Sequence, residues 1–250
     1  MSAETGSNER TPVWRYRWTR GELIQRGCAL PYLDHLSRKQ LEHVYEPSDD
    51  SYLFVDTIRS LGNIFREEIF KSSTSIFSVE LGSGSGVLLT TLLQELHSKG
   101  NFSIAVDCNI HACEATMSTF QENGCDTMGD MIQGDLLSSF RENVFDMLIF
   151  NPPYVPTSSE EIQVGDNLSA AWAGGKKGRE VLDRLLLDLT RVMKKKSLIL
   201  VLAVEENDPD DIVSILEAKD YVCGCLASRK AMNERLLIIM ALRSFDDFNW

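Results

Sequence analysis

The sequence predicts an α/β protein with a seven-stranded, mostly parallel sheet that ends in an antiparallel hairpin. Two patterns predict this fold. From Tyr45 onward, short apolar runs alternate with segments of helical periodicity, which is the order of a βαβ series. The last two apolar runs are separated by too few residues for a crossover helix, so they must pair as antiparallel neighbours.

The elements follow one another in a regular order. A helix begins at the acidic, proline-containing stretch 47–50 and carries an apolar stripe as far as Leu61. Strands are expected at residues 76–81, 103–107, 131–133, 144–150, 198–204, 221–226 and 236–242. Further helices are expected at residues 88–96, 111–122 and 179–193, and after Asp208-Pro209, where Asp208 should cap the helix and Pro209 should open it.

Length and charge bound the domain organisation and the partners. With 250 residues, we expect an N-terminal extension over residues 1–44 and one α/β domain over residues 45–250. The net charge of −12 makes nucleic acid an unfavourable partner, because binding to phosphates depends on lysine and arginine. No apolar run is long enough to span a membrane.

The cysteines and histidines indicate no metal site. The 6 cysteines include no C-x-x-C pair, and the 4 histidines have no metal-ligand spacing. Unpaired cysteines of this kind are typical of reduced thiols, so we expect a cytoplasmic protein that could also enter the nucleus.

Three alternating glycines follow the first predicted strand. Gly82, Gly84 and Gly86 let the chain turn tightly and bring its backbone close to a ligand. A dinucleotide-binding loop has the spacing G-x-G-x-x-G, whose last glycine packs beside a pyrophosphate. Here Val87 occupies the position of that last glycine. The loop therefore favours a cofactor without a pyrophosphate.

Acidic residues follow the second and third predicted strands. Asp107 ends the second strand, where its carboxylate can accept both hydroxyl groups of an adenosine ribose. NAD and S-adenosylmethionine both contain this group, so Asp107 indicates a nucleoside cofactor without distinguishing the two. Asp135 and Leu136 follow the third strand, where an acidic and an apolar side chain could flank an adenine.

Asn151-Pro152-Pro153-Tyr154 closes the fourth predicted strand and indicates the chemistry. The two prolines remove two backbone donors and fix φ, which leaves a rigid turn. The side-chain oxygen of Asn151 and the carbonyl of Pro152 can accept the two N–H groups of an amide or an exocyclic amine, and Tyr154 can stack on that planar group. Because the lone pair of such a nitrogen is delocalised, positioning and electrostatics must promote its alkylation.

These motifs resemble those of the HemK-like nitrogen methyltransferases, which methylate the glutamine of a Gly-Gly-Gln motif in peptide release factors. The resemblance rests on residues 151–154 and on Glu80 with the three glycines that follow it. Two further stretches, VYEPSDD at 44–50 and AAWAGGKKGRE at 170–180, resemble the eukaryotic branch. The likeness extends from about Tyr45 to Leu242 and leaves the first 40 residues unassigned.

The resemblance implies a class I, Rossmann-like methyltransferase fold with S-adenosylmethionine as cofactor. It implies catalytic roles for Asn151, Pro152 and Tyr154. The cofactor contacts that it implies come from Asp50, Ser51, Glu80, Gly82, Gly84, Asp107, Asp135, Leu136 and Asn151. It also implies a class I peptide release factor as the protein substrate and a heterodimer with a small zinc-binding activator subunit.

The third predicted strand offers a physical reason for such a heterodimer. It should lie at an edge of the sheet, and it contains no lysine or proline that would prevent pairing with another chain. We expect an apolar surface for the subunit from Met128, Met131 and Ile132, and from Ala112, Cys113, Ala115 and Met117 of the preceding helix. The alternative is that the N-terminal extension covers this edge.

Two other functions stay open at this point. The enzyme could instead methylate the side-chain nitrogen of a lysine in a protein such as a histone, or N6 of adenine in a nucleic acid. The acidic charge and the lack of a target-recognition domain disfavour nucleic acid. A binding module without activity is the third alternative, and the combination of the glycine loop with Asp107 and Asn151 disfavours it.

Overall fold

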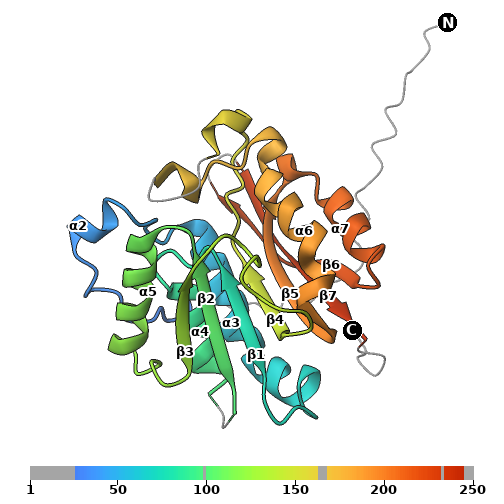
Figure 1. Ribbon diagram of the computed structural model, residues 1–250, viewed down its shortest axis with the longest axis horizontal. Helices are drawn as coiled ribbons and strands as arrows, with labels where there is room; N and C mark the ends of the chain where they lie inside the picture. Colours follow the sequence, from blue (N-terminus) through green and yellow to red (C-terminus); the bar gives the residue numbers. More distant parts are fainter. Residues whose placement is uncertain (1–25, 98–99, 163–167, 232–233, 245–250) are drawn as a thin grey trace, which may run out of the picture.

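The computed structural model describes residues 26–97, 100–162, 168–231 and 234–244, which form a three-layer α/β fold (Figure 1). Its sheet has 7 strands in the order β3-β2-β1-β4-β5-β7-β6. These are β1 (Phe77–Leu81), β2 (Phe102–Asp107), β3 (Gly129–Gln133), β4 (Phe145–Phe150), β5 (Met193–Val204), β6 (Val222–Ala231) and β7 (Glu234–Arg243). Only β7 runs antiparallel to its neighbours, β5 and β6. The predicted sheet with its C-terminal hairpin is confirmed.

Helices cover both faces of this sheet (Figure 1). One face carries α3 (Asp49–Ile64), α4 (Val87–Glu95) and α5 (Ile110–Glu122), and the other carries α6 (Glu180–Val192) and α7 (Pro209–Glu217). The shorter helical turns are α2 (Arg38–Leu41), η2 (Phe65–Ile69), η3 (Ser159–Glu161), η4 (Leu168–Ala171), η5 (Lys176–Gly178) and η6 (Glu205–Asn207).

The two helical layers explain why β5 is apolar over most of its length. Leu198, Leu200 and Leu202 pack in the core that includes α3 and α4. The intervening residues Ile199 and Val201 pack in the core that includes α6 and α7. Because successive side chains of a strand point to opposite faces, a strand between two helical layers needs an apolar residue at every position.

Strand β5 begins earlier than the sequence predicts. It starts at Met193 instead of residue 198, because Met193 already pairs with Phe145 of β4. The next pair is Leu198 with Met147, so the register shifts and the intervening three lysines bulge out of the ladder. The lysines obscured this start, since a run of charges is not typical of a strand interior.

The C-terminal half of the fold contains two further differences from the predictions. The hairpin strands are longer than expected, because pairing continues through polar residues to Ala231 and Glu234. Pro209 does open α7, but the side chain of Asp208 makes no cap hydrogen bond. Asp208 has φ 60°, and its carboxylate instead accepts from Lys177 Nζ at 3.1 Å.

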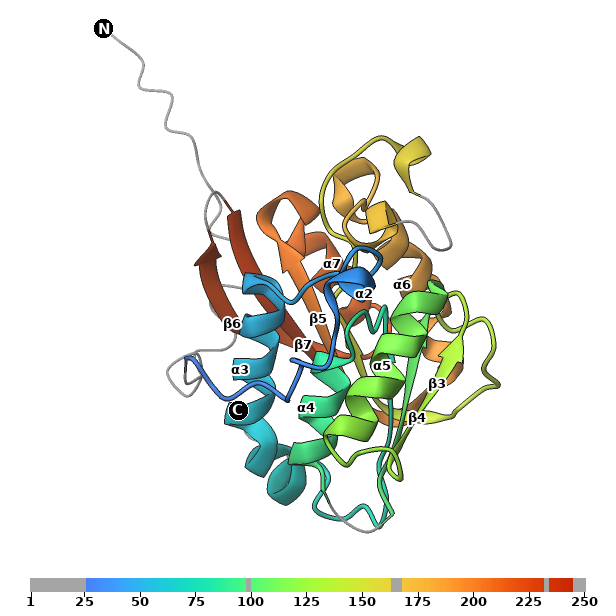
Figure 2. The ribbon, with the colours of Figure 1, turned by 90° about the vertical axis from the view of Figure 1, so that its left-hand side faces the viewer.

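The described part of the N-terminal extension, residues 26–44, crosses the face made by α3, α4 and α5 (Figure 2). Asp56 of α3 accepts hydrogen bonds from the backbone N–H groups of Gly27 and Cys28 at 3.2 and 2.8 Å. At the far end of α5, Asn123 exchanges hydrogen bonds with the backbone of Tyr32 at 2.8 and 2.9 Å. Residues 1–25 of the expected extension lie outside the described residues.

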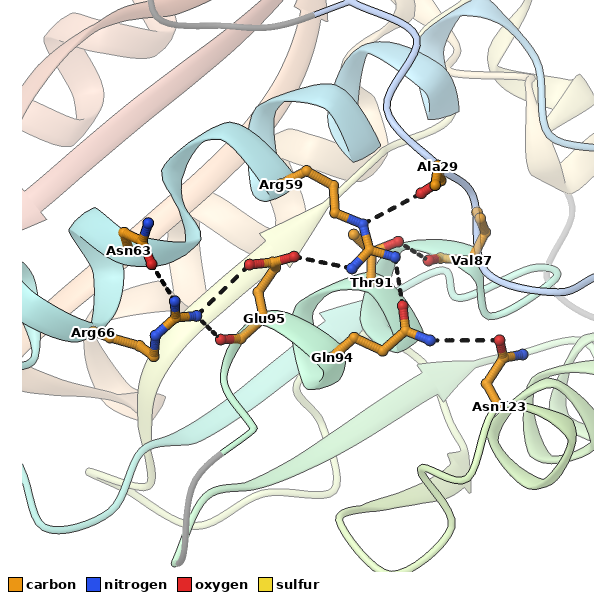
Figure 3. Close-up of polar contacts among 9 residues, drawn as sticks. All are labelled: Ala29, Arg59, Asn63, Arg66, Val87, Thr91, Gln94, Glu95 and Asn123. Atoms are coloured by element: carbon orange, nitrogen blue, oxygen red, sulfur yellow. Dashed lines mark hydrogen bonds and ion pairs between the residues drawn. The ribbon is translucent and has the colours of Figure 1, made fainter.

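A polar network joins this segment to the helices below it (Figure 3). Arg59 of α3 donates to the backbone oxygen of Ala29 at 3.3 Å, to Glu95 at 2.9 Å and to Gln94. Arg66 of η2 also contacts Glu95. The arginine of one helix therefore holds both the neighbouring helix and the segment that crosses it.

One expectation about exposed apolar surface is wrong. Ala112, Cys113 and Ala115 of α5 are buried. Ala112 and Ala115 pack in a small core with Leu36 and Val44 of the N-terminal segment. The sequence could not show this, because a segment without periodicity gives no signal of the face on which it packs.

The third strand lies at an edge of the sheet, as predicted. Within the described residues, the backbone of β3 pairs with β2 alone. Met131 and Ile132 of β3 are both half-buried.

Among the helices in the described ranges, none is both long and apolar enough to cross a membrane.

Candidate functional site

The glycine loop turns between β1 and α4 with its backbone facing a cavity. Gly82, Gly84 and Gly86 all have positive φ, at 63°, 54° and 79°. A Cβ on Gly86 would lie 2.9 Å from the Cα of Thr116, so only glycine allows α4 and α5 to approach this closely. A Cβ on Gly84 would meet no atom within 4 Å, because that side of the loop is open.

Two carboxyl groups at the ends of β1 and β2 flank the loop. Glu80 is buried and accepts from the backbone N–H of Leu89 at 3.0 Å. Asp107 accepts from the N–H groups of Gly84 and Asn109 at 3.0 and 2.9 Å. Burial raises the pKa of both groups, and the backbone donors partly offset that rise. Asp107 stays partly exposed at the cavity wall, where it can accept further donors.

Asn151 lies at the end of β4, held by a residue from the start of α3. Its Nδ2 donates to Oδ2 of Asp50 at 2.9 Å. Its Oδ1 is buried and has no hydrogen-bond partner within the described part of the chain. Asp50 is itself buried and also accepts from Tyr45 Oη and from the N–H of Ser51, at 3.3 and 2.6 Å. Because Nδ2 is the atom of Asn151 that binds Asp50, Oδ1 of the same amide points away from this carboxylate and can accept a donor from a ligand.

Most of the predicted site residues meet at one cavity. Its lining includes Ser51, Glu80, Gly82, Gly84, Asp107, Asp135, Leu136 and Asn151. Asp135 also forms an ion pair with Arg184 of α6, and Leu136 has φ 50°. These residues come from the ends of β1, β2, β3 and β4 and from the start of α3, as expected for a ligand at the carboxyl edge of a parallel sheet.

Asp50 and Tyr154 do not line that cavity but line a second one, and Pro152 lines neither. Residues that contribute to the second cavity include Ser48, Asp49, Val155, Pro156, Val204, Glu206 and Glu234. The Asp50–Asn151 hydrogen bond lies where the two cavities meet, because each partner lines one of them. The structure thus separates the predicted site into two adjoining spaces.

Tyr154 is held in the second cavity by its hydroxyl group. Tyr154 Oη donates to Glu234 Oε1 at 3.1 Å. Burial raises the pKa of Tyr154, and the charges of Asp50 and Glu234 raise it further. Burial also raises the pKa of Glu234, and the hydrogen bond from Tyr154 partly offsets that rise. The tyrosine therefore stays protonated near neutral pH and can act as a surface and a donor, not as a base.

Several lining residues were missed by the sequence reasoning. His43 and Val44 line the first cavity from the end of the N-terminal segment, Tyr45 lines it from the next position, and Ala170 and Ala171 line it from η4. Val44, Tyr45, Ala170 and Ala171 belong to stretches that carried the family resemblance, which was the available signal for them.

His43 and Glu234 had no such signal. The His43 ring stacks on His111 at 4.5 Å, and its backbone oxygen accepts from Asn109 Nδ2 at 2.8 Å. Glu234 comes from the C-terminal hairpin, 80 residues from Tyr154. Among the described residues, no group of three or more histidine, cysteine or acidic side chains is placed to hold a metal.

Comparisons with known proteins agree with this geometry. Residues 63–176 match the family model of the methyltransferase small domain. The human protein named methyltransferase HEMK2 is 31% identical, with 86% of this chain and 97% of that protein aligned. The eRF1 methyltransferase catalytic subunit mtq2 of Schizosaccharomyces pombe is 30% identical over 85% of this chain and 95% of its own length.

One solved structure with a similar fold is the E. cuniculi Mtq2–Trm112 complex, described as responsible for methylating the eRF1 termination factor. Its matching chain is 28% identical with a TM-score of 0.56, and the match covers 81% of this chain and 99% of that one. The sheet order, the glycine loop and the Asn-Pro-Pro-Tyr turn of this chain agree with these similarities. This chain belongs to the HemK-like family of methyltransferases, in the branch of its eukaryotic and archaeal members.

Proposed function

We propose that this enzyme transfers the methyl group of S-adenosylmethionine to the side-chain amide nitrogen of the glutamine in the Gly-Gly-Gln motif of a class I peptide release factor. The observation that carries the proposal is the orientation of Asn151. Its Nδ2 is taken by Asp50, and its buried Oδ1 is without a donor among the described residues. A buried acceptor without a donor costs about 1–3 kcal/mol, so the site favours a ligand that brings an N–H group.

The names of the relatives support a release-factor glutamine as the group that is methylated. The S. pombe relative is named as an eRF1 methyltransferase, and more distant bacterial relatives are named release factor glutamine methyltransferases. A glutamine side chain offers a planar amide with two N–H groups. Asn151 Oδ1 and the carbonyl of Pro152 are the two acceptors that the motif provides for them.

The first cavity fits S-adenosylmethionine. Asp107 presents a carboxylate that can accept the hydroxyl groups of a ribose, and the open side of Gly84 leaves room for a ligand directly over the loop. Asp135 and Leu136 would flank the adenine, and Ser51 and Glu80 would face the rest of the cofactor. The chemistry that the cofactor would supply there is an electrophilic methyl group on a sulfonium.

The residues of the chain contribute positioning and polarity. Asn151 and Pro152 would hold the two N–H groups of the amide and so turn its nitrogen lone pair toward the first cavity. Tyr154, fixed by Glu234, would lie against the planar group from the second cavity. Because Tyr154 stays protonated, it does not remove the proton, and the rate gain must come from alignment and fixed dipoles.

A methyl-transfer assay with labelled cofactor tests the proposal. Release factor, histone and DNA are offered in parallel, and we expect incorporation into the release factor and its loss when the motif glutamine is replaced. Asn151→Ala should lower the single-turnover rate by about 10²–10³ while cofactor affinity stays nearly constant. Methylation of histone or DNA in place of the release factor would refute the proposed acceptor, and a variant with more than about a third of the rate would refute the role of Asn151.

We also propose that the enzyme works as a heterodimer with a small zinc-binding activator subunit. The E. cuniculi structure, a complex of an Mtq2 with Trm112, supports a partner subunit, and its binding of zinc is what the family resemblance implies. The outer side of β3 is a backbone edge without a pairing strand in the described chain, and Met131 and Ile132 on it are only half-buried. A partner strand there would satisfy the backbone groups and cover apolar surface.

Co-expression with a Trm112-like subunit tests this assembly. Met131→Lys should reduce the amount of complex recovered at least tenfold, because a charge would be buried at the shared edge. Val222→Lys is the matched control, since Val222 is 54% exposed on β6, the opposite edge strand of the sheet. A lone chain that is monomeric, soluble and fully active would contradict the heterodimer.

A further inference from the structure

The stretch 174–179 packs backbone against backbone on the Asn151–Tyr154 turn. A Cβ on Gly174 would lie 2.4 Å from the carbonyl oxygen of Pro153, and a Cβ on Gly178 would lie 1.9 Å from that of Tyr154. Gly174 also donates its N–H to the oxygen of Val155 at 2.9 Å. These glycines are needed because any side chain would push the turn away.

One buried asparagine joins this loop to the turn. Asn207 follows β5 and is 1% exposed. Its Nδ2 lies 2.9 Å from the carbonyl oxygen of Tyr154, 2.8 Å from that of Lys177 and 3.3 Å from that of Gly178. Its Oδ1 accepts from the N–H of Val204 at 2.8 Å. A single amide group therefore connects the end of β5, the glycine stretch and the turn.

Tyr154 is consequently held at two points. Asn207 binds its backbone carbonyl, and Glu234 binds its hydroxyl group at 3.1 Å. Arg179 in turn holds Asn207, because its Nη1 donates to the backbone oxygen of Asn207 at 3.2 Å and pairs with Asp211 at 2.8 Å. These contacts lie outside the cofactor cavity, so they bear on the acceptor side of the site.

We propose that Asn207 is a positioning residue for methyl transfer, which acts by fixing the carbonyl of Tyr154 and thereby the place of its ring beside the acceptor. This inference rests on the proposed function. A displacement of about 1 Å at a reacting group can lower a rate by about 10²-fold. The Tyr154 ring is attached to the backbone of this turn, so a shift of the turn moves the ring with it. The amide of Asn207 sets that turn because it binds both sides of the backbone contact.

Asn207→Asp is the sharpest variant, because it keeps the shape and the acceptor for Val204 but removes the amide donor. We expect its single-turnover rate on release factor to fall at least tenfold at saturating substrates, with the cofactor Kd within twofold. In a Tyr154→Ala background the same substitution should change the rate by less than twofold, since the effect acts through the ring. Effects that multiply in full, or a matching loss of cofactor affinity, would overturn the proposal.

Hydrogen exchange tests whether Asn207 holds the turn, and it needs no protein substrate. Val155 and Thr157 donate their N–H groups to the oxygens of Trp172 and Gly175, at 3.0 Å in both cases. In Asn207→Asp both amides should exchange about tenfold faster, while Gly82 and Ser83 in the cofactor loop should not change. Unchanged exchange at Val155 and Thr157 would overturn the proposal.

A second variant and a control complete the experiment. If Asn207→Asp folds poorly, Asn207→Ala takes its place, and it should show the same loss of rate and the same faster exchange. Ser197→Ala is the matched control, because Ser197 is a buried polar residue of β5, the strand that precedes Asn207, and its hydroxyl group bonds that of Tyr221 at 3.1 Å. It should lower stability without changing the rate or the exchange of the turn. A wild-type enzyme that is inactive on release factor would refute the proposed function alone. Hydrogen exchange would still show whether Asn207 holds the turn.

Discussion

Replacing Asp50 by asparagine tests how the orientation of Asn151 is set. In the structure Asp50 accepts from Asn151 Nδ2 at 2.9 Å, from Ser51 N at 2.6 Å and from Tyr45 Oη at 3.3 Å. An asparagine at position 50 would bring an NH₂ group of its own. The Asn151 amide could then turn around, which would point its Nδ2 instead of Oδ1 toward the acceptor.

The magnitude follows from the burial of Asp50, which is 3% exposed. Water cannot replace a hydrogen bond at so buried a position, and a bond to a charged group contributes about 1.5–3 kcal/mol. Because about 1.4 kcal/mol corresponds to a tenfold change in rate, we expect the single-turnover rate to fall about 10- to 150-fold. The cofactor Kd should change less than threefold, since Asp50 lines the second cavity and not the first.

The assay measures single-turnover methyl transfer and cofactor binding by calorimetry on the same preparation. Asp210→Asn is the matched control, because Asp210 is likewise an acidic residue in the first turn of a helix, α7, and it lines neither cavity. It should leave the rate within threefold. An Asp50→Asn enzyme with an unchanged rate would refute the reasoning. A loss of affinity larger than the loss of rate would instead make Asp50 a cofactor contact, as the family resemblance implies.

Two further changes test the first cavity. Asp107→Ala should weaken S-adenosylmethionine binding at least tenfold in calorimetry, because charged hydrogen bonds to the ribose are lost; unchanged affinity would remove Asp107 from the site. Glu80→Gln should alter the pH dependence of stability. Burial raises the pKa of Glu80 well above 4.5, so wild type loses stability as pH rises from about that value through the raised pKa. In urea unfolding without cofactor from pH 5 to 8, the glutamine variant should lose less stability than wild type, and identical slopes would contradict this.

The order and type of the elements could be predicted because each carries a local signal. The apolar period distinguishes strands from helices, and parallel strands covered on both faces are apolar at successive positions, as in β5. The errors arose where the signal was local but misleading. Three lysines hid the start of β5, and Asp208 looked like a helix cap although its carboxylate binds Lys177.

The sequence by itself determined the elements of the fold and the groups that can bind and orient a cofactor and an amide: the glycine loop, Asp107 and the Asn-Pro-Pro-Tyr turn. These could be read because each motif is contiguous and follows a strand. Only the tertiary structure decided how the groups are shared between two cavities, with Tyr154 and Asp50 on one side and the glycine loop on the other.

The residues that hold the motif in place were likewise decided by the tertiary structure. Asp50 is 101 residues from Asn151, and Asn207 is 53 residues from Tyr154. Contacts over such distances leave no periodicity in a single sequence. They arise because the carboxyl ends of parallel strands converge at one edge of the sheet, where buried polar groups must find partners from whichever segment the fold brings there.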